Sequence, residues 1–164
     1  LTAPINKTLP PAKNDIVPSK GARYFSVGGR AMKSTGRKKL REYAGLFVAG
    51  AVGYSLLEIL WRGDTHWTMG VTGGLCLSTL YRLSGAVKDW GTGARCALGS
   101  AVITGYELAV GWLVNLKLGW RVWDYSALPF HFRGQICLLY STIWFLLSMP
   151  IFGLCYLLRQ HHRG

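Results

Sequence analysis

Acidic side chains are scarce in this sequence, which has seven Asp and Glu residues against 19 Lys and Arg among its 164 residues. Charged residues make up only 16% of the chain, and half of its residues are hydrophobic. Since a soluble domain carries about 25% charged residues, the shortfall indicates contact with lipid. The net charge of +12 would suit nucleic acid, but the basic residues flank hydrophobic stretches and no nucleic-acid-binding module is recognisable. We therefore expect no nucleic-acid partner.

Sequence motifs for nucleotide, hydrolytic and metal chemistry are also missing. The chain has no G-x-x-x-x-G-K-[ST], so it cannot hydrolyse ATP through a P-loop, and it has neither G-x-S-x-G nor H-E-x-x-H. Its cysteines form no C-x-x-C pair and lie in apolar segments, which favours free thiols packed as small hydrophobic groups. We expect no cofactor and no metal site. Whether the chain is an enzyme stays open, with a non-enzyme favoured. The four cysteines are Cys76, Cys96, Cys137 and Cys155.

Residues 1–41 form a basic segment that carries ten of the 19 Lys and Arg residues. Its prolines interrupt regular structure, and no apolar core follows a basic start, as a secretory signal would require. We expect a disordered cytoplasmic tail over residues 1–41 and a transmembrane domain over residues 42–160. The four prolines of the tail are Pro4, Pro10, Pro11 and Pro18.

Four hydrophobic stretches follow the tail, and each approaches the roughly 20 residues that cross a bilayer. The second is short and is interrupted by glycines, so it could be tilted, broken or re-entrant. The small residues Gly45-Ala49-Gly53 and Gly70-Gly74, spaced at four, suit close helix packing. The sequence thus predicts an all-α fold, a polytopic membrane helix bundle with about four transmembrane helices. These cover roughly residues 43–61, 67–83, 94–116 and 134–158.

The distribution of positive charge predicts the orientation in the membrane. If both termini and the 83–94 loop lie on one side, that side carries fifteen Lys and Arg, and the other side carries four. Cytoplasmic loops are enriched in these residues, so we expect the N-terminus and the C-terminus inside, which requires an even number of spans. The chain is then a multi-pass membrane protein.

The two halves of the transmembrane domain resemble each other. Each reads as a rising helix, an outer loop and a descending helix, which predicts two similar helical hairpins related by an axis along the membrane normal. Chance similarity between two Gly- and Trp-rich hairpins is the alternative. The matched positions are Gly53-Tyr54 with Gly105-Tyr106, Gly63 with Gly119, Trp67 with Trp123, Gly73 with Gly134, and Cys76 with Cys137.

Two acids, Glu58 and Glu107, lie inside the predicted spans. A carboxylate in a span is costly and tends to face the bundle interior or a water-filled cavity. Each is either a substrate, cation or proton site or a buried hydrogen-bonding group that locks helices together. Arg62 follows Glu58 at i+4 and can pair with it. For Glu107 we expect an interior position near Tyr54, Glu58, Tyr106 or a water.

The second outer loop contains Asp124 and Arg121. Asp124 could cap the following segment, pair with an arginine such as Arg121, or bind a polar ligand, with capping or pairing favoured. Asn115, near the end of the third span, is interpreted as a helix cap.

The stretches GYSLLEILWRGDTHWTMGVTGGLC and ITGYELAVGWLVNLKLGWRVWDYSALPFHFRGQICLLYSTIWFLLS resemble a family of small bacterial integral membrane proteins. These are named type IV ABC-transporter permeases, or CmpB-like proteins. The resemblance covers roughly residues 42–150 and is most specific between Trp120 and Leu138. It implies a location in the bacterial plasma membrane and a role in transport, without a substrate to carry over.

Our leading hypothesis is a membrane transporter or permease subunit of unknown substrate. Glu58, Glu107 and Asp124 would line or gate its pathway, with Arg62 and Arg121 as counter-charges. Four helices enclose little space, so besides the lipid bilayer we expect a homo-oligomer or a separate ATPase, which would dock on the 83–94 loop. The alternatives are a membrane-embedded enzyme acting on lipid or envelope precursors, and a non-catalytic membrane scaffold or sensor.

Overall fold

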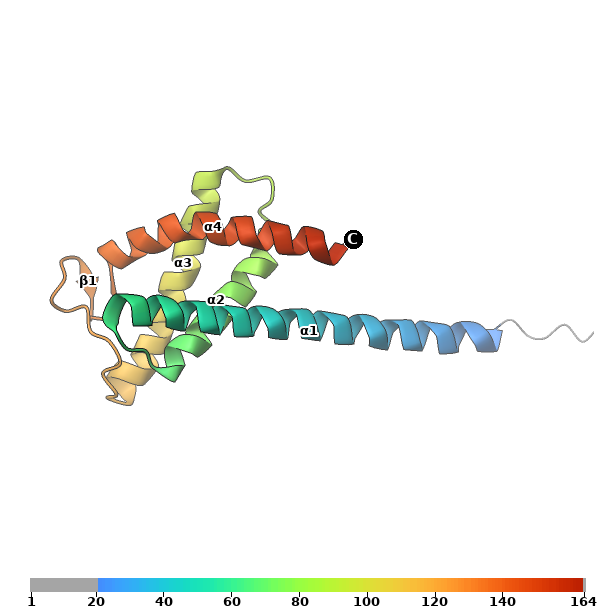
Figure 1. The fold of residues 1–164 in the computed structure, drawn as a ribbon, viewed down its shortest axis with the longest axis horizontal. Coiled ribbons are helices and arrows are strands. Elements are labelled where there is room, and N and C mark those ends of the chain that lie inside the picture. Colours follow the sequence, from blue (N-terminus) through green and yellow to red (C-terminus); the bar gives the residue numbers. More distant parts are fainter. Residues whose placement is uncertain (1–20, 164) are drawn as a thin grey trace, which may run out of the picture. The chain divides into compact units, whose positions relative to one another are not determined.

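Four long helices carry most of the chain in the computed structural model, which describes the backbone of residues 21–163 and the side chains of residues 36–161. The predicted all-α class is confirmed. The helices are α1 (Gly21–Arg62), α2 (Trp67–Ser84), α3 (Thr92–Gly111) and α4 (Leu138–Arg163), and a π-helix, η1 (Trp112–Lys117), continues α3 (Figure 1). Two short strands, β1 (His131–Phe132) and β2 (Ile136–Cys137), pair in antiparallel orientation.

The chain divides into two units, residues 1–38 and residues 39–164. In the first unit, the chain is helical from Gly21 onward, so residues 21–41 of the expected tail belong to α1. This start fits the sequence, because no proline follows Pro18 until residue 129 and proline is the residue that most strongly opposes a helix interior. The remainder of the expected tail, residues 1–20, lies outside the described residues.

Three helical segments of the described chain are long and apolar enough to cross a bilayer: Gly36–Arg62, Thr92–Lys117 and Leu138–His161. They correspond to the first, third and fourth predicted spans. Helix α2 coincides with the second predicted span but is not apolar enough to be counted among these segments. Its 18 residues extend about 27 Å at 1.5 Å per residue, slightly less than the ~30 Å of hydrocarbon. The candidate spans are therefore three instead of about four.

Helix α2 lies in the interior of the bundle, where it packs on α3 and α4 and half of its residues are buried. Two of its hydroxyls are satisfied within the helix: the Thr72 hydroxyl donates to the Thr68 carbonyl at 2.8 Å, and the Ser84 hydroxyl donates to the Tyr81 carbonyl at 2.7 Å. The small and hydroxyl-bearing residues of α2 make it too polar for a typical lipid-facing span. The same residues pack well against other helices, which suits a helix that contacts α3 and α4.

Glycines allow α1 to approach α2 closely. A Cβ atom added at Gly50 would lie 2.5 Å from the carbonyl oxygen of Gly73, and one added at Gly74 would meet the ring of Phe47 at 2.7 Å. The predicted role of the Gly70–Gly74 segment is therefore confirmed. On α1 the contact uses Gly50, and not the predicted stripe, since a Cβ at Gly53 would meet no described atom within 4 Å.

Arg159, near the end of α4, forms hydrogen bonds to the end of α2. Its Nε donates to the Ser84 hydroxyl at 2.9 Å, its Nη2 donates to the Tyr81 carbonyl at 2.6 Å, and its guanidinium lies over the Tyr81 ring. A cation at a helix C-terminus interacts favourably with the helix dipole. The Tyr81 hydroxyl in turn donates to Glu42 of α1, so three helices are joined at this end.

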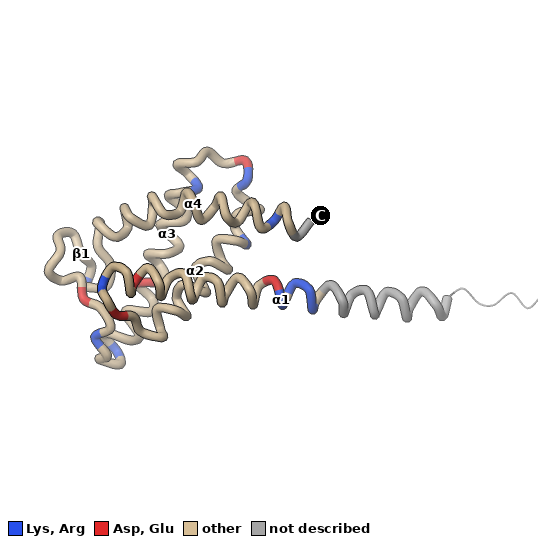
Figure 2. Tube along the Cα trace, viewed as in Figure 1, with Lys and Arg blue, Asp and Glu red and all other residues tan. Residues whose placement is uncertain are grey.

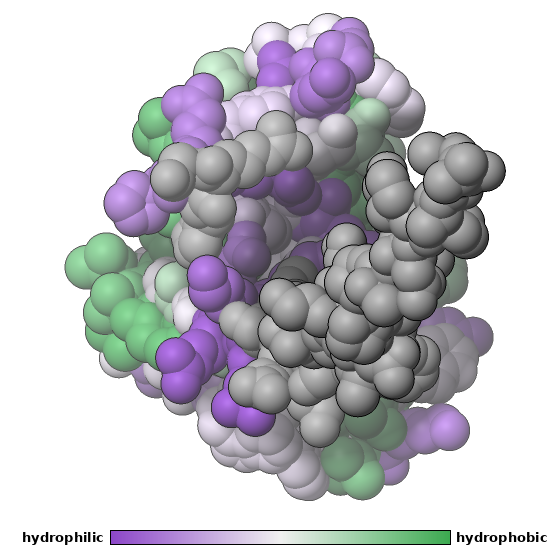
Figure 3. Space-filling view, turned by 90° about the vertical axis from the view of Figure 1, so that its right-hand side faces the viewer, coloured by the Kyte–Doolittle hydropathy of each residue, from purple (hydrophilic) through white to green (hydrophobic). Residues whose placement is uncertain are grey.

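Lys and Arg residues lie near helix ends and in the connections, and the stretches 42–61, 63–81, 96–116 and 134–158 contain none (Figure 2). Viewed from the side toward which α4 runs, the surface is hydrophilic around its centre and at the top, with hydrophobic patches at the left and lower edges (Figure 3). This distribution matches a bundle whose sides face lipid and whose ends face water.

Helix α4 begins at Leu138, four residues later than the predicted fourth span. The β1–β2 hairpin occupies the preceding residues. At its turn Gly134 has φ +69°, a left-handed conformation that glycine adopts without steric cost and that cannot continue a right-handed helix. An added Cβ there would also collide with the carboxylate of Asp124. The predicted helical start at Gly134 is therefore wrong.

Candidate functional site

Glu107 of α3 lies in the centre of the bundle with 1% of its surface exposed. Its Oε1 accepts a hydrogen bond from the Tyr54 hydroxyl of α1 at 3.0 Å, and its Oε2 accepts one from Trp144 Nε1 of α4 at 2.9 Å. The prediction that this acid faces the interior beside a polar partner is confirmed. Tyr54 was among the expected partners, whereas Trp144 was not. One carboxylate thus connects three helices.

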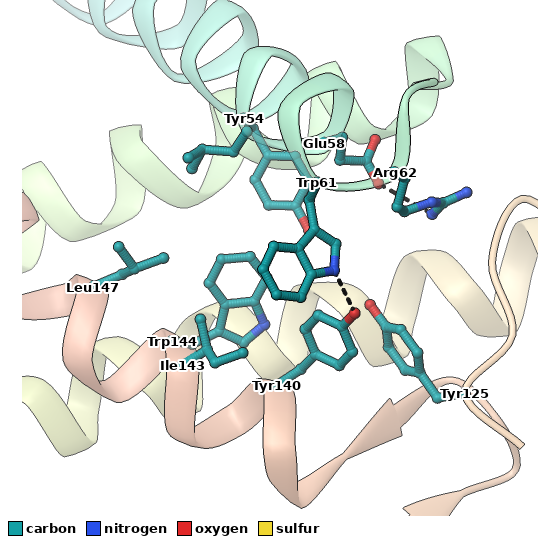
Figure 4. A pocket seen from close by; sticks show the side chains of 10 residues that line it. Tyr54, Glu58, Trp61, Arg62, Tyr125, Tyr140, Ile143, Trp144 and Leu147 are labelled. Carbon is teal, nitrogen blue, oxygen red and sulfur yellow. Dashed lines mark hydrogen bonds and ion pairs between the residues drawn. The ribbon is translucent and has the colours of Figure 1, made fainter. Parts of the chain in front are cut away.

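A cavity of about 120 Å³ lies beside this carboxylate, between the end of α1, the start of α4 and the connection that follows η1 (Figure 4). Two of the predicted site residues, Glu58 and Arg62, line it. In Figure 4 they lie at one end of the cavity, with aromatic rings from α1 and α4 across from them. The lining residues are Tyr54, Leu57, Glu58, Trp61, Arg62, Tyr125, Tyr140, Ile143, Trp144 and Leu147.

The predicted i,i+4 pair of Glu58 and Arg62 is present, with Arg62 Nη1 at 3.3 Å from Glu58 Oε1. The other oxygen of Glu58 accepts a hydrogen bond from the Thr65 hydroxyl at 2.6 Å. Arg62 also donates from Nη2 to the Val122 carbonyl at 2.9 Å, and its Nε lies 3.7 Å from Asp64. All three nitrogens of the guanidinium are therefore engaged with protein oxygens.

Aromatic rings make up most of the remaining wall. Tyr125 and Tyr140 stack with centroids 4.5 Å apart, and Trp61 Nε1 donates to the Tyr140 hydroxyl at 3.0 Å. Burial raises the pKa of Tyr125, which keeps its hydroxyl protonated. Tyr54 and Trp144 stack with centroids 5.6 Å apart. Because these two also donate to Glu107, that carboxylate lies one hydrogen bond behind the cavity wall.

A second, larger cavity of about 360 Å³ adjoins the first. The two share Tyr54, Leu57, Trp144 and Leu147 as lining residues. The rest of the second cavity is formed by apolar and small residues from α1, α2, α3 and α4, including the kink-prone Pro150. A chamber that contains the Glu58–Arg62 ion pair and an apolar chamber therefore meet at the Tyr54–Trp144 pair.

The connection after η1 is held by a buried amide network that the sequence analysis did not anticipate. Asn115 donates to the Trp123 carbonyl at 3.0 Å and to Gln135 Oε1 at 2.8 Å, and its own oxygen accepts the Val122 amide at 2.7 Å. Trp123 Nε1 donates to the Gln135 carbonyl at 3.0 Å. Asn115 therefore organises the whole connection rather than capping a helix. Its signal in the sequence is an amide at the end of an apolar span.

Asp124 and Arg121 lie in the same connection but do not line either cavity. Asp124 is exposed, and its Oδ1 accepts the Ser126 amide at 2.8 Å, a turn that Asp side chains favour. This hydrogen bond lowers the pKa of Asp124 below its usual range. Arg121 is exposed with φ 50°. Of the five predicted site residues, the structure brings together Glu58, Arg62 and, behind the wall, Glu107.

Comparison with known proteins assigns the chain to a family. No curated protein and no solved structure matches the chain. Residues 65–162 match the family described as "Putative ABC-transporter type IV". The matched region contains Glu107 and the cavity residues of α4, whereas Glu58 and Arg62 precede it. Since the match covers more than half of the chain and three helices are apolar enough to span a membrane, the chain belongs to this family of ABC-transporter-type membrane proteins.

Proposed function

We propose that the chain is a transporter or permease subunit in which the cavity between α1 and α4 receives the substrate and Glu107 responds to it. The observation that supports this proposal is that Tyr54 and Trp144, which donate hydrogen bonds to Glu107, also line the cavity. An occupant that displaces either ring changes the hydrogen bonds of the buried carboxylate. Ionisable groups inside a membrane bundle commonly mark ion, proton and substrate pathways.

We propose that both termini lie in the cytoplasm of a bacterial cell. Arg159 and Glu42 join the ends of α4, α2 and α1, and this end also carries Lys39 and Arg41, so the positive-inside rule puts it inside. The even number of crossings then requires α2 to cross as well. This is physically reasonable because half of the residues of α2 are buried, so the helix need not contact lipid on all sides.

Thiol labelling tests the orientation. In a variant without the four native cysteines, we expect a single cysteine at Lys88 to be protected from a membrane-impermeant maleimide in intact cells, and one at His131 to react. The side chain of Lys88 is 67% exposed and His131 is exposed, so protection would report sidedness and not burial. Labelling at Lys88 combined with protection at His131 would reverse the topology.

We propose that the transmembrane domain consists of two similar helical hairpins. Gly63 and Gly119, which the sequence match pairs, both have positive φ angles, +82° after α1 and +70° after η1, which supports a common origin. The paired tryptophans differ in surroundings, since Trp67 is 66% exposed and Trp123 is 4% exposed. A duplication would therefore have diverged at the outer connections.

We expect the subunit to act in the bilayer with further copies of itself or with a separate ATPase. The connection between α2 and α3 is the surface we assign to the ATPase. Asp89 and Trp90 project from it, with 84% of the Asp89 side chain and 51% of Trp90 exposed, while Val87 anchors it in the core.

Transport by inside-out membrane vesicles tests the function. We expect vesicles from cells that produce the chain, supplied with ATP, to accumulate at least one small molecule that control vesicles do not. Glu107→Gln should abolish the accumulation without lowering the amount of protein in the membrane, because it keeps the shape but cannot carry a negative charge. Identical vesicle contents with and without the chain, measured by mass spectrometry, would contradict a transport role.

A further inference from the structure

We propose that the cavity between α1 and α4 binds an organic cation, an ammonium group that carries an alkyl chain. The ammonium group occupies the chamber of about 120 Å³ and the alkyl chain occupies the adjoining chamber of about 360 Å³. The inference rests on the proposed function only in naming this cation as the class of substrate. The binding site itself rests on the charges, rings and volumes of the two chambers.

Negative charge is concentrated at the first chamber. The chain has a net charge of +12 and only seven acids, yet two of them lie at the chamber. Glu58 lines it, and Glu107 is bonded to two of its wall residues. Among the described lining residues, Arg62 is the one basic side chain. A cation entering this chamber meets two carboxyl groups and one guanidinium.

Arg62 does not turn the chamber into an anion site. Its Nη1, Nη2 and Nε are directed to Glu58, the Val122 carbonyl and Asp64 respectively. An anion would have to displace these partners, leaving the carboxylates without their counter-charge, which is costly away from water. The chamber therefore favours cations over anions.

The wall chemistry selects an organic cation over a metal ion. Five aromatic rings line the chamber, and aromatic cages attract ammonium groups through the negative faces of their rings. Leu57, Ile143 and Leu147 complete the wall, whereas hard metal ions require a shell of oxygen ligands. The volume equals that of about four liquid water molecules, enough for a small headgroup and too little for a drug-sized ligand. The rings belong to Tyr54, Trp61, Tyr125, Tyr140 and Trp144.

The second chamber determines which substituent the organic cation has. It is lined by apolar and small side chains and shares four residues with the first. A group that passes between the chambers remains in contact with Tyr54 and Trp144 throughout. An alkyl chain attached to the ammonium group would bury apolar surface there, which is favourable in proportion to the area removed from water.

Binding to the full-length chain in lipid nanodiscs tests the inference. The probes are tetramethylammonium, hexyltrimethylammonium and hexanesulfonate. Isothermal titration calorimetry measures the binding of each, and the signal of empty nanodiscs is subtracted. We expect hexyltrimethylammonium to bind about 10-fold more tightly than tetramethylammonium, or better, because its additional methylenes enter the apolar chamber. Hexanesulfonate, with the same chain and opposite charge, should not bind measurably above empty nanodiscs.

Two matched pairs of variants locate the site. Glu58→Gln should weaken hexyltrimethylammonium binding about 10-fold or more, whereas Asp64→Asn, which removes an equal charge from a side chain that is 77% exposed, should change it by less than about 3-fold. Tyr125→Leu should weaken binding by about 3- to 30-fold, and Tyr125→Phe, which keeps the ring, should not. Unchanged thermal unfolding of each variant establishes that it is folded.

Equal affinity for the two ammonium probes would overturn the role of the second chamber. Binding of hexanesulfonate as tight as that of hexyltrimethylammonium, or equal effects of Glu58→Gln and Asp64→Asn, would overturn the cation site. These outcomes are separable from the proposed function. Vesicle transport that depends on Glu107 without cation binding would refute this inference alone, while cation binding without any vesicle transport would refute the transport role alone.

Discussion

Replacing Glu107 by leucine should lower the free energy of unfolding by about 2–5 kcal/mol, because two buried donors lose their acceptor. Tyr54 and Trp144 both donate to this carboxylate, which is 1% exposed, and leucine offers them no acceptor. Glu107→Gln should be close to wild type, since its carbonyl can accept from Trp144 while its amide donates to the Tyr54 hydroxyl. Reversible denaturation in mixed detergent micelles measures both.

A double-mutant cycle identifies the cause of the loss. In the wild-type background, Tyr54→Phe removes one donor of Glu107 and should destabilise the bundle by about 1 kcal/mol. In the Glu107→Leu background the same change removes an unsatisfied hydroxyl and should be neutral or stabilising. If Tyr54→Phe costs the same in both backgrounds, the hydrogen bond contributes nothing and packing alone holds Glu107 in place.

Replacing Asn115 by alanine should destabilise the connection after η1 by about 2–4 kcal/mol, because one amide side chain satisfies three buried or half-buried groups there. These are the Val122 amide, the Trp123 carbonyl and the side chain of Gln135. Asn115→Asp should be equally harmful, since it keeps the acceptor for Val122 but directs a carboxylate at two acceptor oxygens. Hydrogen exchange measured by mass spectrometry should show faster exchange over residues 118–137.

Asp124→Asn is the matched control in the same connection. Asp124 is exposed and accepts the Ser126 amide, a turn that asparagine forms as readily as aspartate. We therefore expect protection from exchange to be unchanged in this variant. If residues 118–137 of Asn115→Ala exchange as slowly as those of the wild type, the hairpin and Trp123 stabilise the connection without the amide network.

Much of the membrane character of the protein follows from local sequence. A stretch of about 20 apolar residues forms a helix in lipid whatever its neighbours, because its backbone groups must bond within the segment. This is why the first, third and fourth spans were predicted correctly to within a few residues at most ends. The same reasoning gave Glu58 its partner, since residues four apart on a helix are neighbours, and it directed Glu107 inward, since a carboxylate in hydrocarbon is costly.

Local sequence was a weaker guide where structure depends on packing. Hydropathy judges α2 a poor transmembrane span because its glycines and hydroxyl groups score as unfavourable in lipid. Half of its residues, however, are buried inside the protein. The fourth span was started too early because Gly134 looks like part of an apolar run, and its left-handed φ arises from a hairpin of only two residue pairs. Neither feature has a periodicity that a sequence pattern could reveal.

By itself, the sequence determined the helical class, the bilayer as the surroundings, the family resemblance and the few acids worth examining, because each depends on residue type and spacing along one segment. Only the tertiary structure decided which residues share a site. Trp144 meets Glu107 across 37 positions of sequence, and Trp61 meets Tyr140 across 79. Such contacts form where helices cross, and the crossing is set by the glycines and side-chain volumes of all the helices together, which no single segment records.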